Sequence, residues 1–425
     1  MHDHAAPRPW FDRLDWPMAA FALASLLLLR LTIPTIGVSL PLVDGLLEPS
    51  GCVIGRDFAN LWTGGRAALT GDYGALFDAD RHTRELARLL HPDLVRHYWS
   101  YPPTAFWLGL PLAALPYAAA LALWTLAGLA AIAWTLMRAG PSWRATAYLV
   151  LIFASPPGVI ALLFGQTALL TTAALIAGLT LAGTRPRLAG ALLGLMVIKP
   201  HLGLVVPLAL AARRQWPAFI ATAGCALAYL AATVAAFGLE PWRLFVDVTL
   251  PQQAQLLGVV TEAMNLNISP FMLVRALGFE QAPALAVHGA IALLGLAAAF
   301  SIMRSNPSPE VRLVAFSLAT LIASPYVLAY ELVLVFTALA LWALTLDRDG
   351  RQELVLPTLV LLVVLAPAAV YHSAAGRDCG LIPAVLILAL AALWVLVPRA
   401  AAIGPSDGLG VEPFRPAPDP NPAAL

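Results

Sequence analysis

Apolar stretches of about 20 residues alternate with short polar turns along most of the chain, and this is the pattern of helices that cross a bilayer. The alternating ten-residue pattern of an outer-membrane barrel is absent. Ten full crossings are predicted, at residues 17–38, 117–138, 145–164, 166–184, 216–237, 283–303, 311–328, 330–346, 354–372 and 381–397. The pattern therefore predicts an all-α polytopic membrane protein.

Short arginine-containing turns separate many of these stretches. Such turns are typical of cytoplasmic loops, because basic residues accumulate on the inner side of a membrane. They lie at residues 138–144, 185–187, 213–214, 304–312 and 348–351, with Arg399 close to the C-terminal tail. We place all of them on the cytoplasmic side, and the ten predicted crossings satisfy this arrangement.

Shorter apolar pieces remain, and we predict them to be half-helices or re-entrant elements, which raises the helix count to between 10 and 13. They are residues 103–115, the pair 188–198 and 202–212, and residues 268–279. The alternative for the pair is one continuous crossing over 188–212, which would place Arg213 and Arg214 outside. The re-entrant interpretation is favoured because Pro200 and the charge of Lys199 lie in the middle of the segment.

The predicted topology gives one membrane domain over residues 1–403, followed by a disordered, Pro-rich cytoplasmic tail at 404–425. The apolar run that begins at Pro17 lacks a small-residue cleavage site, so we expect it to be retained as the first helix. Residues 40–103 form the first external loop, which is the largest hydrophilic part of the protein, and residues 238–267 form the second.

Within the first external loop, residues 79–98 have leucines at helical spacing with charges between them. These leucines are Leu86, Leu89, Leu90 and Leu94. The spacing predicts an amphipathic helix lying in the membrane interface. The loop histidines His82, His91 and His97 form no metal set by spacing and are interpreted as solvated or interfacial.

The composition agrees with a membrane protein, since 60% of the residues are hydrophobic and only 12% are charged. The net charge of +1 gives no indication of nucleic-acid binding. Of the 25 basic residues, Lys199 alone is a lysine, which makes this position worth examining. The three cysteines have no metal-type spacing. Cys52 and Cys379 both fall outside in this topology, and a disulfide between them is left open.

The unusual polar residues of the membrane domain gather near external helix ends. They are Asp57, Gln166, Asn265, Glu331 and His372, with Lys199 at the tip of the re-entrant pair. We therefore expect a shared external cavity. Asp57 has two interpretations, a helix cap or salt bridge to Arg56 or Arg66, and a general base that accepts the proton of an attacking hydroxyl.

Lys199 and His201 are interpreted either as a helix break with a snorkelling cation or as contacts to a lipid phosphate, and the phosphate is favoured because the flanking residues are apolar. Arg30 could snorkel outward or meet the same phosphate. Gln166 could form a turn and helix start or hydrogen-bond a sugar.

Tyr326, Tyr330 and Glu331 occupy a predicted external turn. Tyrosines at that depth are usually interfacial anchors. Glu331 is followed directly by apolar residues, so pairing with a cation and binding of an acceptor both remain open.

In these motifs the sequence resembles glycosyltransferase family 87, which includes polyprenyl-phosphate-mannose-dependent α-(1→2)-mannosyltransferases of the bacterial envelope. The matching pieces are Asp57-Phe58 with Trp62, Gly65-Arg66-Ala67-Ala68, Tyr101-Pro102-Pro103, Gly165-Gln166, Ile198-Lys199-Pro200-His201, Ser324-Pro325-Tyr326 and Tyr330-Glu331-Leu332. They occur in order from about residue 55 to 335. Two positions depart from the family pattern: Glu331 stands where Asp is expected, and His201 where Gln is common.

The resemblance implies a GT-C-type fold, a lipid-phosphate sugar donor, inversion at the anomeric carbon and an acidic base in the first external loop. That role falls to Asp57. We expect the donor phosphate to be bound by Lys199, His201, Arg30 and Arg66. We expect the sugar and acceptor to contact Gln166, Tyr101, Tyr326, Tyr330 and Glu331.

The sequence thus predicts a membrane glycosyltransferase that transfers a hexose, with mannose as the first choice, to a lipid-linked or glycan acceptor. It is expected to need no cofactor and no metal, and to act at the external side of the bacterial plasma membrane. Its partners would be the polyprenyl-phosphate sugar, the acceptor and membrane lipids, with no nucleic acid. A transporter of lipids or lipid-linked sugars is the main alternative, and an assembly subunit is a third.

Overall fold

The computed structural model describes residues 18–19, 22–23, 45–48, 51–258, 266–305, 307–345 and 382–396, and within them the fold is helical apart from two isolated β-bridges. The α-helices are α2 (Arg56–Thr70), α3 (Tyr73–Phe77), α4 (Ala79–Leu89), α5 (Phe106–Gly109), α6 (Tyr117–Met137), α7 (Trp143–Ala154), α8 (Pro156–Leu163), α9 (Ala168–Leu181), α10 (Pro186–Gly194), α11 (Pro200–Gly203), α12 (Val206–Ala212), α13 (Trp216–Phe237), α14 (Glu240–Leu244), α15 (Leu250–Gly258), α16 (Pro270–Ala276), α17 (Gln281–Arg304), α18 (Pro309–Ala323), α19 (Leu332–Thr345) and α21 (Ile382–Leu396). The shorter turns are η2 (Pro103–Ala105), η3 (Leu110–Leu112), η4 (Leu195–Ile198), the π-helical η5 (Phe245–Thr249) and η7 (Ala329–Glu331).

Several sequence-based predictions fall outside the described residues. These are most of the first crossing, the crossing at 354–372, the tail from 404, and the side chains of Arg30, Asn265, His372 and Cys379. The disulfide between Cys52 and Cys379 therefore stays untested.

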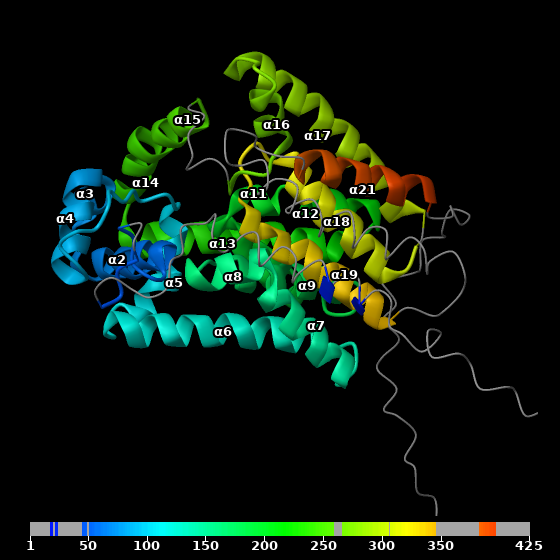
Figure 1. Cartoon of the computed structure of the whole chain (residues 1–425), viewed down its shortest axis with the longest axis horizontal. Coiled ribbons are helices and arrows are strands. Elements are labelled where there is room, and N and C mark those ends of the chain that lie inside the picture. The colour runs from blue at the N-terminus through cyan, green and yellow to red at the C-terminus, as the bar shows by residue number, and fades with distance from the viewer. Residues whose placement is uncertain are drawn as a thin grey trace, which may run out of the picture.

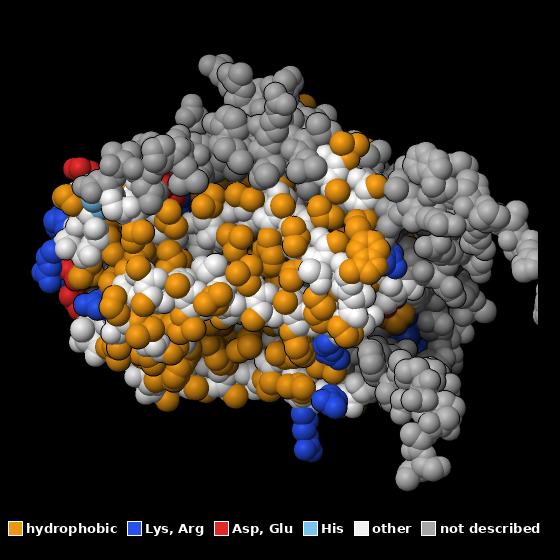
Figure 2. Space-filling model, turned by 60° about the horizontal axis from the view of Figure 1, so that its bottom comes forward, with side chains coloured by type: hydrophobic (Ala, Val, Ile, Leu, Met, Phe, Trp, Pro, Cys, Tyr) orange, Lys and Arg blue, Asp and Glu red, His pale blue; other side chains and the backbone are white. Residues whose placement is uncertain are grey.

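Three of the described helices are long and apolar enough to cross a membrane, namely α6, α13 and α17. They match the predicted crossings at 117–138, 216–237 and 283–303 to within two residues. Large apolar side chains on each are exposed, among them Leu126, Ile220 and Leu294. Exposed apolar surface of this extent belongs against lipid, and Figure 2 shows hydrophobic side chains over the middle of one face. The chain is an all-helical, multi-pass membrane protein.

The predicted crossing at 145–164 is wrong as a single helix. The structure divides it into α7 and α8, which are bent by 68° relative to each other. Ser155 lies between them in an extended conformation and caps α8. The bend follows from Pro156 and Pro157, because a proline lacks the N–H needed to continue a helix and disfavours helical geometry in the residue before it.

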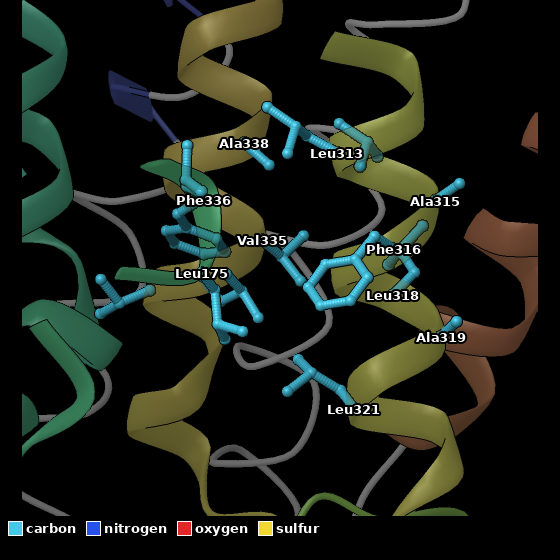
Figure 3. Packing of buried hydrophobic residues seen from close by; sticks show 14 of the residues in the cluster. Leu175, Leu313, Ala315, Phe316, Leu318, Ala319, Leu321, Val335, Phe336 and Ala338 are labelled. Atoms are coloured by element: carbon cyan, nitrogen blue, oxygen red, sulfur yellow. The ribbon is translucent and has the colours of Figure 1, made fainter. Parts of the chain in front are cut away.

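Helices α18 and α19 form the centre of the main hydrophobic core. Every residue from Val311 to Ala323 and from Leu332 to Ala343 is buried, and Figure 3 shows Phe316 and Val335 packed between these two helices. Helix α18 has 15 residues, fewer than the roughly 20 needed for a crossing, and neither helix is among those long and apolar enough to cross. The number of ten crossings is therefore not confirmed.

The segment 186–212 is a broken hairpin. Helical structure stops at Lys199, whose φ of −131° and ψ of 74° are not helical, and resumes at Pro200. A methyl group added at Gly203 would lie 2.9 Å from the Cβ of Met196, so the second arm folds back on the first. One added at Gly190 would lie 2.4 Å from the Cβ of Ala221, near the start of α13. Both ends of the hairpin thus meet the same end of α13, as the re-entrant interpretation predicts, and a continuous helix is excluded.

The hydrophilic block α2–α5 forms one end of the molecule, at the left of Figure 1, where charged side chains also gather in Figure 2. The predicted helix at 79–98 is shorter than expected, because α4 ends at Leu89, shortly before Pro92. Its Leu86 is fully buried in a second hydrophobic core with Phe58 and Trp99. The apolar side of α4 therefore packs on protein, and the prediction that it faces the membrane interface is not supported.

Two of the loop histidines are also buried, contrary to the prediction that they are solvated. Nε2 of His82 lies 2.8 Å from Oδ1 of Asn60, and Nδ1 of His97 lies 2.7 Å from the carbonyl oxygen of Val95. Burial, together with His97, lowers the pKa of His82 to about 4. His82 is therefore neutral and helps to hold α4 against α2.

The contact between α2 and α5 requires two glycines. A methyl group at Gly109 would lie 1.9 Å from the carbonyl oxygen of Leu61, and one at Gly65 would lie 2.3 Å from the carbonyl carbon of Gly109. We expect Gly109→Ala to lower stability by at least about 1–3 kcal/mol, because backbone must move to admit the methyl. Thermal unfolding in detergent measures this. The control is Gly224→Ala, where no atom lies within 4 Å, and equal melting of both variants would contradict the close packing.

Candidate active site

The N-terminus of α2 joins the C-terminus of α8 end to end. The N–H of Gly55 donates to the carbonyl of Leu163 at 2.7 Å, and the N–H groups of Asp57 and Phe58 donate to the carbonyl of Phe164 at 3.0 and 3.2 Å. The first N–H groups and last carbonyls of a helix lack partners within it. Each helix end here satisfies the other, and this fixes the position of Asp57.

Glycine is required on both sides of this joint. Gly55 and Gly165 have φ values of 77° and 62°, in the left-handed region that other residues rarely adopt. Two side chains of α6 hold the joint: the hydroxyl of Tyr117 donates to the carbonyls of Ile54 and Gly55, and the indole of Trp124 donates to that of Gly165 at 2.9 Å. Sequence reasoning missed Tyr117 and Trp124, because aromatics near a helix end are usually interfacial anchors.

The joint brings Asp57 beside Gln166. Nε2 of Gln166 donates a hydrogen bond to Oδ2 of Asp57. Gln166 is buried, whereas Asp57 keeps part of its surface exposed. Asp57 is therefore held in place from one side and remains accessible from another.

Lys199 lies on the other side of Gln166. Its ammonium nitrogen is 3.4 Å from Oε1 of Gln166 and 2.5 Å from Oε1 of Glu331. The side chains of Lys199 and Glu331 are 7% and 2% exposed, so their charges are buried and paired. Asp57, Gln166, Lys199 and Glu331 form one hydrogen-bonded row, which we call the polar cluster.

Four further predicted site residues lie around the polar cluster. The ring of Tyr330 lies 5.1 Å from the ammonium of Lys199. The hydroxyls of Tyr101, Tyr326 and Tyr330 are within electrostatic range of both Asp57 and Glu331. His201 packs edge-on against the ring of Tyr326, with centroids 6.5 Å apart. Segments far apart in the sequence therefore converge on one site.

The two arginines proposed as partners of Asp57 are engaged elsewhere. Arg56 forms an ion pair with buried Glu48 at 2.6 Å. Arg66 follows Asp57 by nine residues, or about 14 Å of helix. Its guanidinium stacks on Trp62 at 5.0 Å and lies near the carbonyl of Ala113. In the described part of the chain, the structure does not bring Arg66 into contact with the polar cluster.

Burial dominates the electrostatics of Asp57. Withdrawal from water raises its pKa above the ordinary value, while the charges of Arg56 and Lys199 and the hydrogen bond from Gln166 act in the opposite direction. With Asp57 and Glu331 ionised and Lys199 protonated, the polar cluster carries a net charge of −1. A partly exposed carboxylate whose surroundings raise its pKa, in a polar site, is a candidate proton acceptor.

The polar cluster lies at the opposite end of the helices from the arginine-rich turns. Gln166 lies two residues before α9, Glu331 directly precedes α19, and Lys199 is at the tip of the hairpin. At the far ends, Arg144 donates to the carbonyl of Ala343 at the end of α19. The ends of α9, α12 and α17 and the start of α18 meet around a shared pocket lined by both Arg213 and Arg312.

The helical membrane fold and its buried polar cluster are features of a membrane-embedded enzyme or carrier. Residues 99–325, more than half of the chain, match the model of glycosyltransferase family 87. The chain belongs to this family, and it is a membrane glycosyltransferase. No curated protein and no solved structure matches it. The matched region contains Gln166 and Lys199, while Asp57 and Glu331 lie on either side of it.

Proposed function

We propose that the protein transfers a hexose, mannose in the first instance, from a polyprenyl-phosphate donor to a hydroxyl of a lipid-linked or glycan acceptor. The observation that carries this proposal is the polar cluster, which places a partly exposed carboxylate and a buried ammonium on opposite sides of Gln166. A base for the acceptor and a cation for the donor phosphate are the two groups that such a transfer needs.

The reaction is a single displacement. Asp57 accepts the proton of the acceptor hydroxyl as its oxygen forms a bond to the anomeric carbon. The bond between that carbon and the phosphate oxygen breaks, its electron pair stays on the phosphate, and the anomeric configuration is inverted. The phosphate leaves without a nucleotide, in keeping with the absence of a Gly-rich phosphate loop from the sequence.

Lys199 would stabilise the charge that develops on the leaving phosphate. An ammonium has three N–H donors, and Glu331 and Gln166 accept two of them, at 2.5 and 3.4 Å. Within the described residues the third has no hydrogen-bond acceptor, and we assign it to a phosphate oxygen. His201 and Arg30 are proposed to assist, whereas Arg66 lies too far along α2 for this role. Tyr101, Tyr326 and Tyr330 would line the sugar and acceptor side of the site.

The external face of the membrane is the proposed location of the reaction. Arginine-rich turns mark the cytoplasmic side, and the polar cluster lies at the other ends of the helices that these turns connect. A GT-C-type fold and the bacterial plasma membrane are part of the same proposal.

The donor class can be tested with purified protein in detergent. Polyprenyl-phosphate mannose and a nucleotide-activated mannose, each radiolabelled, are offered with a mixed pool of envelope lipids as acceptor. We expect label to appear in a product of changed polarity, with inverted configuration, from the lipid donor alone. Transfer from the nucleotide sugar alone would contradict the proposal. Movement of the lipid donor across reconstituted vesicles without chemical change would identify a transporter instead.

A further inference from the structure

The orientation of the Gln166 amide is fixed by opposite charges at its two ends. Its NH₂ group donates to the carboxylate of Asp57, and its carbonyl oxygen faces the ammonium of Lys199. A rotated amide would point oxygen at the carboxylate and N–H groups at the ammonium, and both contacts would be repulsive. An amide has a distinct donor end and acceptor end, so the charges on either side of Gln166 permit one orientation.

Lys199 is itself fixed by Glu331. Their side chains are buried, and the 2.5 Å contact is the shorter of the two that the ammonium makes with polar side chains in the described residues. Lys199 sits at the break of the hairpin 186–212, and Glu331 lies in η7 just before α19. A single amide therefore links this ion pair to Asp57 by hydrogen bonds, in addition to the charge of Lys199 acting through space.

We propose that Gln166 is a positioning residue that transmits the Lys199–Glu331 ion pair to Asp57, keeping the carboxylate ionised and turned toward the acceptor. This inference rests on the proposed function only in taking Asp57 as the base. It assigns Gln166 and Glu331 to the orientation of the base rather than to direct contact with the sugar.

Other groups that face Asp57 act on its charge through space, but in the described residues they form no hydrogen bond that would orient its carboxylate. Arg56, on the same helix, is paired with Glu48 at 2.6 Å. The remaining titratable groups in electrostatic range among the described residues, apart from Lys199, are tyrosine hydroxyls from three segments: Tyr101, Tyr117, and the pair Tyr326 and Tyr330. Tyr117 donates its hydroxyl hydrogen to backbone carbonyls. Gln166 is the side chain that the described residues place in hydrogen-bond contact with the carboxylate.

The protonation of Asp57 can be measured without turnover. A hydrophobic carbodiimide reacts with the protonated form of a carboxyl group, and mass spectrometry of the Asp57 peptide follows the reaction across pH in the purified full chain. Loss of the hydrogen bond from Gln166 should raise the pKa of Asp57. We expect the midpoint of labelling in Gln166→Met to move upward by about one pH unit, the order of shift that such contacts produce.

Two further variants separate positioning from general disturbance. Thr167→Val alters the next residue, whose buried hydroxyl has no hydrogen-bond partner among the described residues, and it should leave the midpoint unchanged. The double variant Lys199→Met with Glu331→Gln removes the ion pair without leaving a lone buried charge. It should raise the midpoint, and this rise should shrink by more than half in the Gln166→Met background.

An unchanged midpoint in Gln166→Met would overturn the proposal, as would an equal effect of the double variant in both backgrounds. The latter result would mean that the field of Lys199 acts on Asp57 directly. Failure of the proposed function is distinguished separately, because the wild type would then give no transfer from the lipid donor, and failure of the base assignment would leave transfer intact in Asp57→Asn, whatever the labelling shows. With an active enzyme, the acidic limb of the pH profile of kcat/KM should shift in each variant by the same amount as the labelling midpoint of Asp57.

Discussion

Replacing Asp57 by Asn is expected to lower kcat for sugar transfer by about 10²–10⁴-fold, the contribution of a positioned general base. An amide has nearly the same shape as a carboxylate but cannot accept the proton. The joint between α2 and α8 uses backbone N–H groups at this position, so the fold should survive. Monodisperse elution and an unchanged melting temperature are the controls. Full turnover by the variant would remove Asp57 from the mechanism.

The same assignment predicts the pH dependence of transfer. The base must be ionised to act, and burial raises the pKa of Asp57 above its ordinary value. Below that raised pKa the carboxyl group is protonated, so kcat/KM for the acceptor should fall as the pH decreases through it and should reach a plateau above it. A rate that stays flat through the carboxyl range, in an enzyme whose other steps are not limiting, would contradict the assignment.

The second large effect concerns the ion pair of Lys199 and Glu331. Removing one partner leaves an uncompensated buried charge, and the cost of this is about 3–5 kcal/mol. We therefore expect both Lys199→Met and Glu331→Gln to melt at clearly lower temperatures in detergent than the wild type. The double variant should recover much of this loss, because a neutral pair of similar size leaves no lone charge. It should not recover transfer, since the leaving phosphate would lack its cation.

An exposed pair supplies the matched control. Arg96 and Asp80 are 3.0 Å apart, with side chains 55% and 65% exposed. Exposed pairs contribute about 0–1 kcal/mol, so Arg96→Met should change the melting temperature little. Single variants of Lys199 and Glu331 that are as stable as Arg96→Met would show that the buried charges are not coupled as the structure indicates.

The helices at the perimeter could be predicted closely from the sequence. In α6, α13 and α17 the apolar run is long enough to cross a membrane and is bounded by polar turns. The hydropathy and the turn residues therefore indicate the same helix ends. The break at Lys199 was also predictable, because Pro200 interrupts the helix and a lone charge stands in the apolar run. Glycosyltransferase family 87 was recognised from short motifs and is confirmed by the family match.

The count of crossings could not be predicted, because hydropathy does not distinguish burial in lipid from burial in protein. Helix α19 is as apolar as a crossing, yet every residue from Leu332 to Ala343 is buried in the core. The same ambiguity explains α4, whose leucines could have faced either the membrane or α2. His82 was misplaced because its partner Asn60 is 22 residues away and nothing in the local sequence indicates the pairing.

At the site, the sequence predicted which residues share an end of the molecule but not which atoms meet. Gln166, Lys199 and Glu331 come together with Asp57 as expected, and Glu331 pairs with a cation, Lys199. Arg66 shows the limit of motif reasoning. Arg66 belongs to the same motif as Asp57, but it lies nine residues further along α2. Nine residues are about two and a half turns of helix, so Arg66 lies away from the polar cluster.

The central claim is that Asp57 is the base of a lipid-phosphate-dependent transferase. The most direct test is transfer of radiolabelled mannose from polyprenyl phosphate, measured with purified wild type and purified Asp57→Asn side by side. We predict a labelled product of changed polarity from the wild type and essentially none from the variant. Equal product from both proteins would contradict the claim.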